Sequence, residues 1–167
     1  MFLFRPSAKL AKRMGVRLAE DDEDSTTALG DWYSTGAVIG RRQLVLCVSE
    51  NSRLSVVLDA APYATIPDRL HLSLQSVLRA IGIPRELAER EVNAMREYRV
   101  AKASNRSVIS TMNQYLISLS YREVPDPYEL SLFLADTVTF SIPEHFPDHA
   151  ARRLFGLPPR PRLRVVT

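Results

Sequence analysis

The pattern of apolar positions predicts strands in one stretch of the chain, from residue 31 to residue 59. Strand side chains point alternately to opposite faces, and Leu44–Val48 is apolar at every position, so both faces of this strand should be covered. The apolar run Leu54–Leu58 follows five polar residues, a length typical of a hairpin connection. A third strand is expected between Gly30 and Gly40. These runs predict a three-stranded antiparallel meander at the centre of the fold.

Shorter elements are expected on either side of this meander. Met1–Arg5 is apolar at its first four positions and precedes a proline, which favours a short strand. Ser7 can cap a helix over Ala8–Met14, and Gly15 can end that helix in the left-handed conformation. Tyr98–Ala103 alternates and is expected to add a strand to the sheet or to lie at its edge.

Helical periodicity dominates the rest of the chain. Pro127 and Pro147 suit the first turn of a helix, where a missing N–H group has no effect. The predicted helices after the meander cover residues 70–81, 84–95, 108–119, 127–138 and 147–155. We therefore expect a single α+β domain over residues 1–156, in which an antiparallel sheet of three to five strands is packed by four or five helices. A Pro/Arg-rich C-terminal tail follows over residues 157–167.

Length and composition agree with one folded domain. The chain has 167 residues, of which 46% are hydrophobic and 25% are charged, and it is long enough to bury a core. The single cysteine, Cys47, excludes an internal disulfide and a CxxC site. The first apolar run is too short for a signal peptide, and no segment approaches the length of a membrane span. We therefore expect a cytoplasmic protein without membrane association.

The net charge of +3 is unevenly distributed. Residues 1–17 and the residues from 150 onward contain basic side chains and no acid, whereas residues 20–24 are all acidic. Basic ends can attract phosphates or another anionic partner, although charge runs are more often solvated surface. The acidic run lies in an expected surface loop and lacks the ligand spacing of a calcium loop.

Motifs for known catalytic chemistry are absent from the sequence. It contains no GxxxxGK[ST], GxGxxG, GxSxG or HExxH. His145 and His149 are four residues apart, but Pro147 places His145 before the helix begins, and two histidines without a third ligand rarely hold a metal. We therefore expect neither a metal nor a cofactor.

Three stretches are richer in polar and aromatic groups than packing requires. The candidate ligand-binding residues in and around them are Lys9, Lys12, Trp32, Arg41, Arg42, Asn51, Arg106, Ser107 and Asn113. The segments SAKLAKRM, GDWYSTGAVIGRRQLVLCVSENSRLSVVL and SNRSVISTMNQY resemble a small bacterial family described only as a domain of unknown function. The resemblance covers roughly residues 1–115. It implies no mechanism, and no functional residue is assigned from it.

An anion site is expected where Arg106 lies near the N-terminus of a predicted helix, because the backbone N–H groups there are free. Lys9 and Lys12 can join this site if the first helix packs near the end of the hairpin. A phosphate, a nucleic-acid backbone or a carboxylate metabolite would satisfy it.

The same residues also have purely structural explanations. Asn105 and Ser107 can cap the helix, Arg106 can pair with an acid of residues 20–24, and Asn113 can bond buried backbone. Trp32 can stack on a base, but an aromatic residue at the start of a strand more often belongs to the core.

Three functions agree with these observations. The first is a non-catalytic binding module for an anionic partner such as nucleic acid, although +3 is a low charge for a dedicated nucleic-acid binder. The second is a small enzyme acting on a phosphoryl or nucleotide substrate, with Arg106 and Lys9 stabilising charge and Asp31 acting as a base. The third is a protein-interaction accessory factor, antitoxin-like or immunity-like, that uses the acidic loop and the C-terminal tail.

Overall fold

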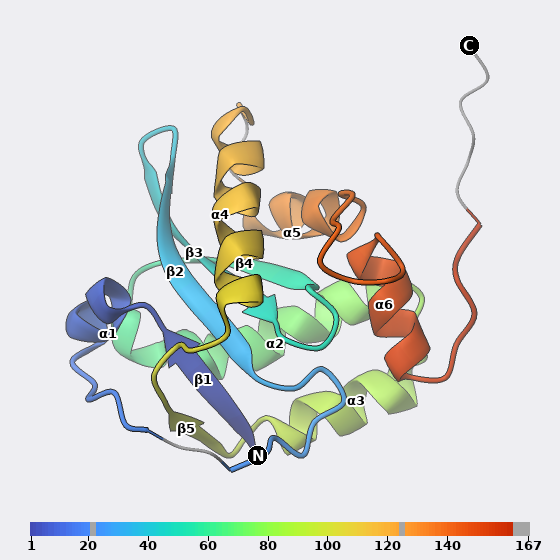
Figure 1. Cartoon of the computed structure of the whole chain (residues 1–167), viewed down its shortest axis with the longest axis horizontal. Coiled ribbons are helices and arrows are strands. Elements are labelled where there is room, and N and C mark those ends of the chain that lie inside the picture. The colour runs from blue at the N-terminus through green and yellow to red at the C-terminus, as the bar shows by residue number, and fades with distance from the viewer. Residues whose placement is uncertain (21–22, 124–125, 162–167) are drawn as a thin grey trace.

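A computed structural model of the chain describes residues 1–20, 23–123 and 126–161 (Figure 1). The strands are β1 (Phe2–Pro6), β2 (Trp32–Ile39), β3 (Arg42–Ser49), β4 (Ser55–Asp59) and β5 (Tyr98–Val100). The helices are α1 (Ala8–Met14), α2 (Ile66–Ala80), α3 (Arg85–Ala94), α4 (Arg106–Ser120), α5 (Pro127–Ala135) and α6 (Pro147–Leu154), with a 3₁₀ turn η1 (Tyr63–Thr65) before α2. The predicted α+β class is confirmed, and the described residues hold six α-helices rather than four or five.

The five strands form one sheet in the order β4-β3-β2-β1-β5. The predicted meander is confirmed, since β2 pairs antiparallel with β3 and β3 with β4. The sheet is nevertheless mixed rather than purely antiparallel, because β1 runs parallel to both β2 and β5. Parallel neighbours need a long connection, and here α1 with the loop that follows it links β1 to β2.

Helices cover both faces of the sheet, as the apolar pattern of β3 predicts. Val45 and Cys47 contribute to a core shared with α1, α2 and α3. Leu44, Leu46 and Val48 contribute to a second core shared with α4 and α5. In Figure 1, α4 therefore lies in front of the sheet and α2 behind it.

Helix ends follow the expected local chemistry at several positions. The Ser7 hydroxyl accepts a hydrogen bond from the backbone N–H of Leu10, and Gly15 ends α1 with a φ of +70°. Pro127 and Pro147 occupy the first turns of α5 and α6. The predicted helix over 127–138 is too long, because α5 ends at Ala135, and Val138 is exposed rather than inward.

Each edge of the sheet is contacted by another part of the chain. At β4, the backbone N–H of Val57 donates to the hydroxyl of Ser131 on α5 (2.8 Å), and Arg69 of α2 donates to the carbonyl of Asp59 (2.7 Å). Beyond β5, the backbone N–H of Lys102 donates to the carbonyl of Ala19 (2.9 Å). These contacts use backbone groups that an edge strand would otherwise leave open.

The first residues of the predicted tail lie against the C-terminal end of α2. Arg160 donates to the carbonyl of Ala80 (3.1 Å) and pairs with the buried carboxylate of Asp148 (2.9 Å). Arg152 of α6 donates to the carbonyls of Ile81 and Gly82. Two arginines thus satisfy carbonyl groups that a helix end leaves without partners. Residues 162–167 of the predicted tail, and residues 21–22 of the acidic run, lie outside the described residues.

Candidate functional site

The first candidate surface lies where α1 packs beside the β2–β3 hairpin. Arg13 of α1 donates to the hydroxyl of Tyr63 (2.7 Å) and to the side-chain oxygen of Gln43 (3.3 Å). The Tyr63 hydroxyl in turn donates to Gln43 (3.0 Å), and the Arg13 guanidinium lies 5.5 Å from the centre of the Tyr63 ring. Neutral groups therefore hold this guanidinium in place, and no carboxylate of the described residues forms an ion pair with it.

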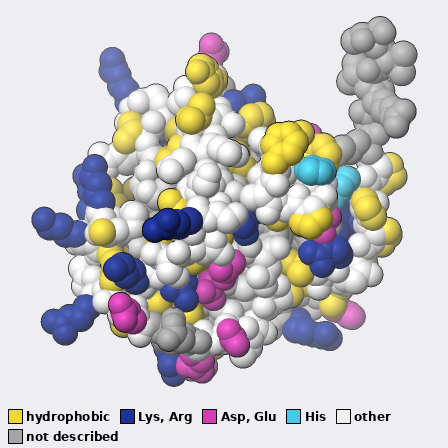
Figure 2. Space-filling view, viewed as in Figure 1, with side chains coloured by type: hydrophobic (Ala, Val, Ile, Leu, Met, Phe, Trp, Pro, Cys, Tyr) yellow, Lys and Arg dark blue, Asp and Glu magenta, His cyan; other side chains and the backbone are white. Residues whose placement is uncertain are grey.

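A cleft of about 160 Å³ opens beside this arrangement. Lys9 lines it together with Arg13, and the residues that line it include no acid. Lys12 on α1 and Arg41 in the hairpin turn are exposed, and Arg41 lies two residues from Gln43, which accepts from Arg13. Figure 2 shows Lys and Arg side chains spread over the side of the molecule that carries α1 and the hairpin. We call Lys9, Lys12, Arg13 and Arg41 the α1 basic surface.

A second polar cluster lies at the start of α4. The Asn105 side chain accepts from the backbone N–H groups of Ser107 (3.0 Å) and Val108 (3.3 Å), as a helix cap does. Its amide group donates to the carboxylate of Glu50 (3.0 Å), and its backbone N–H donates to the hydroxyl of Tyr33 (3.0 Å). Asn105 thus occupies two of the N–H groups that the expected anion site at this helix end would use, as the alternative explanation of Asn105 as a cap expected.

Arg53 completes this second cluster and was not predicted from the sequence. It is only 6% exposed and has a φ of +61°, which is uncommon for a residue other than glycine. Its guanidinium donates to the carbonyl of Glu50 and to the hydroxyl of Ser107 (3.1 Å), while its own carbonyl accepts from Tyr115 (3.0 Å). Burial lowers the pKa of Arg53, and the nearby Tyr115 and Glu50 oppose this shift. A turn of polar residues in the sequence gives no sign that one of them will be buried.

Asp31, the base considered for an enzyme, is held in an ion pair. Its carboxylate accepts from Arg5 at 2.7 Å and from the hydroxyl of Ser25, and Asp31 is buried. Burial lowers the pKa of Arg5, but the hydrogen bond and charge of Asp31 more than compensate, so the pKa is raised. The structure thus gives Asp31 two firm partners and a clear structural role.

The remaining predicted residues do not converge on one site. Trp32 is fully buried in the core, as the structural explanation of this residue expected, so its ring is not accessible for stacking on a base. The Asn51 side chain donates to the carbonyl of Ala28 (3.2 Å). Arg106 and Asn113 lie exposed on α4, two helical turns apart and therefore on one side of the helix. Of the nine predicted residues, Lys9, Lys12 and Arg41 belong to the α1 basic surface.

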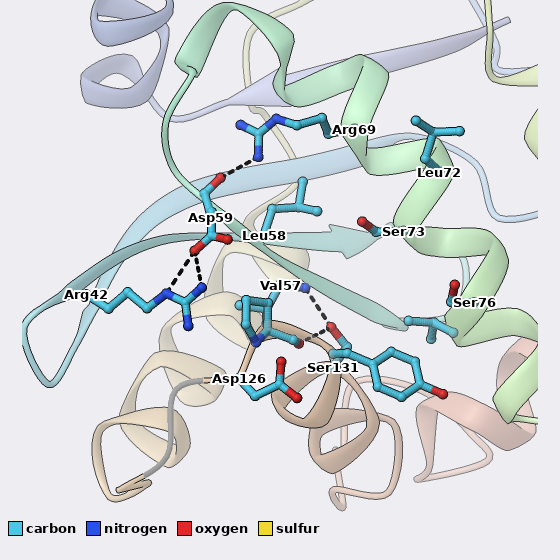
Figure 3. A pocket seen from close by; sticks show the side chains of 13 residues that line it. Arg42, Val57, Leu58, Asp59, Arg69, Leu72, Ser73, Ser76, Asp126 and Ser131 are labelled. Carbon is cyan, nitrogen blue, oxygen red and sulfur yellow. Dashed lines mark hydrogen bonds and ion pairs between the residues drawn. The ribbon is translucent and has the colours of Figure 1, made fainter.

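A larger cleft lies elsewhere, between α2, α5 and the edge strand β4 (Figure 3). Its volume is about 730 Å³, within the range of small-molecule sites. Arg42 is the predicted residue that lines it, and there it pairs with Asp59 (2.7 Å). Sequence reasoning missed this cleft, because residues that are far apart along the chain form its walls.

The described residues include no group of three or more His, Cys, Asp and Glu side chains arranged to hold a metal ion. His145 lies before α6, as Pro147 predicts, and its ring contacts Phe140. The ring of His149 contacts Phe146 instead. Within the described ranges, no helix is both long and apolar enough to span a membrane.

The fold and its surfaces place the chain among small α+β proteins that hold one mixed sheet between two layers of helices. Within this class, the chain belongs to the family described as Domain of unknown function (DUF6933), whose model matches residues 3–150. No curated protein and no solved structure matches the chain. The family match agrees with the resemblance noted in the sequence and extends past residue 115 into α6, so that it includes α1, the hairpin and the large cleft.

Proposed function

We propose that the chain is a non-catalytic binding module for an anionic partner such as nucleic acid, and that this partner contacts the α1 basic surface. The observation that carries the proposal is the environment of Arg13. Its guanidinium is oriented by Tyr63 and Gln43, and its Nε and Nη2 groups form no hydrogen bond with the described residues. An arginine fixed by neutral partners keeps its full charge and still has donors for a phosphate.

The neighbouring residues support the same function. Lys9 shares the cleft with Arg13, and Lys12 on α1 and Arg41 in the hairpin turn add two exposed positive charges. Each can contact a phosphate oxygen without displacing an internal carboxylate. This distinguishes them from Arg42, which is paired with Asp59, and from Arg5, which is paired with Asp31.

Salt dependence gives the proposal a quantitative test. Four phosphate contacts would give a slope of about −3 for the logarithm of the association constant against the logarithm of salt concentration with single-stranded RNA. With few contacts and a net charge of +3, we expect dissociation constants in the micromolar range at low salt.

The experiment is a fluorescence polarisation titration with labelled single-stranded RNA and double-stranded DNA, at low and at near-physiological salt. The test variants are the double substitution Lys9→Ala/Lys12→Ala and the single substitution Arg13→Gln. The matched control is Arg85→Ala/Arg96→Ala, which also removes two positive charges, but from exposed positions in and just after α3. In Figure 1, α3 lies away from α1.

Loss of the two lysines should weaken binding for all sequences and reduce the salt slope by about half, whereas the control should bind like the wild type. The absence of binding by the wild-type protein at low salt would overturn the proposal. Equal losses in the lysine variant and in the control would also overturn it, since only overall charge would then matter.

The accessory-factor alternative is favoured by one separate observation. Phe140 is 83% exposed in the segment between α5 and α6, and exposed apolar side chains also occur at Ile117 on α4 and at Tyr121, the C-cap residue of α4. Exposed large apolar side chains are typical of protein contacts. Phe140→Ser should weaken the binding of a protein partner and leave the salt-dependent binding of nucleic acid unchanged.

A further inference from the structure

The large cleft between α2, α5 and β4 has an apolar floor and a partly apolar rim. Val57, Leu58 and Val77 form the floor and are themselves almost fully buried. Leu72 and Tyr128 line the same cleft and remain 62% and 44% exposed. An apolar ligand group placed here would remove the exposed surface of Leu72 and Tyr128 from water, which favours binding by about 25 cal/mol for each Å² buried.

Small polar residues on α2 create the space in this cleft. Ser73 and Ser76 stand where the outer side of a helix more often carries long charged residues. Neither hydroxyl group forms a hydrogen bond with the described residues, although a serine inside a helix can bond the carbonyl four residues earlier. The two hydroxyls therefore offer a donor and an acceptor to a ligand.

Positive charge is concentrated at the Arg69 end of the cleft. Arg69 donates to the carbonyls of Asp59 (2.7 Å), Ala60 (3.1 Å) and Pro62 (2.9 Å) and to the hydroxyl of Thr65 (3.0 Å). All four acceptors are neutral, so they fix the guanidinium without cancelling its charge. Four of its five N–H donors are used in this way, and one remains.

Negative charge is found at the start of α5, where Asp126 lines the cleft. Asp126 is the N-cap residue of α5, but its side chain makes no capping hydrogen bond. Figure 3 shows Arg69 and Asp126 at opposite ends of the cleft, with the Arg42–Asp59 ion pair between them. Since that pair is neutral as a whole, the cleft is positive at one end and negative at the other.

We propose that this cleft binds a short peptide with free termini. The carboxylate of the peptide lies toward Arg69, and its ammonium group lies toward Asp126. Its apolar side chains cover the exposed surface of Leu72 and Tyr128. An extended peptide of three residues spans about 10 Å. The serine hydroxyls on α2 face its backbone amides. This site is separate from the α1 basic surface and does not depend on it.

The test is isothermal titration calorimetry of the full chain with trileucine and trialanine, each with free termini. The same peptides are then used in N-acetylated and in C-amidated form. A dissociation constant of about 0.1 to 1 mM is expected for free trileucine. Each blocking group should weaken binding about tenfold, because each removes one charge that the cleft complements.

Two variants locate the binding site. Asp126→Asn should weaken the binding of free trileucine about tenfold and leave the binding of the N-acetylated peptide unchanged, since the acetyl group already removes the ammonium charge. Ser73→Phe should fill the cleft and abolish binding. The matched control is Ser110→Phe, which places the same bulk at an exposed serine of α4. Amide chemical shifts in NMR spectra should change at Ser76 and Leu72 when trileucine is added.

Several outcomes would overturn the proposal. One is the absence of saturable binding for both free peptides. Others are equal affinities for free and blocked peptides, wild-type affinity in Ser73→Phe, or shift changes confined to residues outside this cleft. Because neither the probes nor the variants involve the α1 basic surface, each of these results would leave the proposed anion-binding function standing.

Discussion

The carboxylate of Glu91 accepts a hydrogen bond from the backbone N–H of Leu29 at 2.9 Å, across 62 residues of sequence. Its other oxygen accepts from the backbone N–H of Ala28 at 2.8 Å, and Glu91 is almost fully buried on α3. One side chain thus fixes the end of the loop that leads into β2. Both oxygens of the carboxylate are used.

Glu91→Gln should lower the free energy of unfolding by about 1 to 3 kcal/mol, because the amide group would place N–H donors against a backbone N–H. The measurement is urea denaturation at neutral pH. The control is Glu89→Gln, which removes only an exposed pair with Arg85 and should change stability by less than about 0.5 kcal/mol. Equal effects of the two substitutions would contradict the structural role of Glu91.

The pH dependence of stability provides a second test of Glu91. Burial raises the pKa of this carboxyl above its ordinary value of 4.5, and the hydrogen bonds from Leu29 and Ala28 only partly oppose the shift. As pH rises above 4.5, the unfolded chain therefore loses this proton before the folded protein does. Stability falls over that interval and becomes constant above the pKa of the folded state.

The amide of glutamine does not ionise in this pH range, so the stability of the Glu91→Gln variant lacks this contribution to its pH dependence. The difference in unfolding free energy between the wild type and this variant should therefore be larger near pH 4.5 than at pH 7. Urea denaturation of both proteins across this range measures it. A difference that grows with pH would contradict the direction of the pKa shift.

Asn105→Ala should destabilise the protein by about 1 to 2 kcal/mol, because the first turn of α4 loses its cap. Asn105→Asp keeps an oxygen for the two helix N–H groups but replaces the donor to Glu50 with a second carboxylate. Asn105→Asp should therefore be destabilised at neutral pH and recover at acidic pH as the carboxyls protonate. Thermal unfolding at two pH values tests both substitutions, and an Asp variant as stable as the wild type at neutral pH would contradict the contact with Glu50.

Gly30→Ala should be more harmful than Gly40→Ala, although both glycines have a positive φ, of +76° and +62°. A Cβ atom at residue 30 would lie 2.7 Å from the side chain of Asn51, whereas residue 40 has open space around it. We expect a loss of about 1 kcal/mol at residue 40 from backbone strain alone. At residue 30 we expect about 2 to 4 kcal/mol, since Asn51 must also leave the carbonyl of Ala28. Equal losses in denaturation experiments would show that Asn51 moves without penalty.

The sequence was most informative where a feature depends on neighbours along the chain. Apolar runs bounded by polar residues and glycines predicted β2, β3 and β4, and the cap at Ser7 and the stop at Gly15 were readable because the partners lie within one turn. Strand direction was not readable for β1. Its apolar positions would be the same in a parallel and in an antiparallel pair, so the mixed sheet appeared only in three dimensions.

The sites were less predictable than the fold for the same reason. Lys9 and Lys12 could be selected because they are charged and lie on one short helix. Arg69 could not be selected from the sequence, because the orientation of its guanidinium is fixed by backbone carbonyls of the preceding connection, and only the folded chain brings these carbonyls together. Trp32 shows the opposite error, because an aromatic side chain looks the same in the sequence whether it faces a ligand or the core.

The contacts at the edges of the sheet affect how this protein can associate. Ser131 occupies the Val57 N–H at one edge, and Ala19 lies beyond β5 at the other. Among the described residues, these contacts occupy part of each edge of the five-stranded sheet, which disfavours cross-β growth and strand exchange with a second copy. We therefore expect assembly to use side chains on helices and clefts, so that a single surface substitution can separate partner binding from folding.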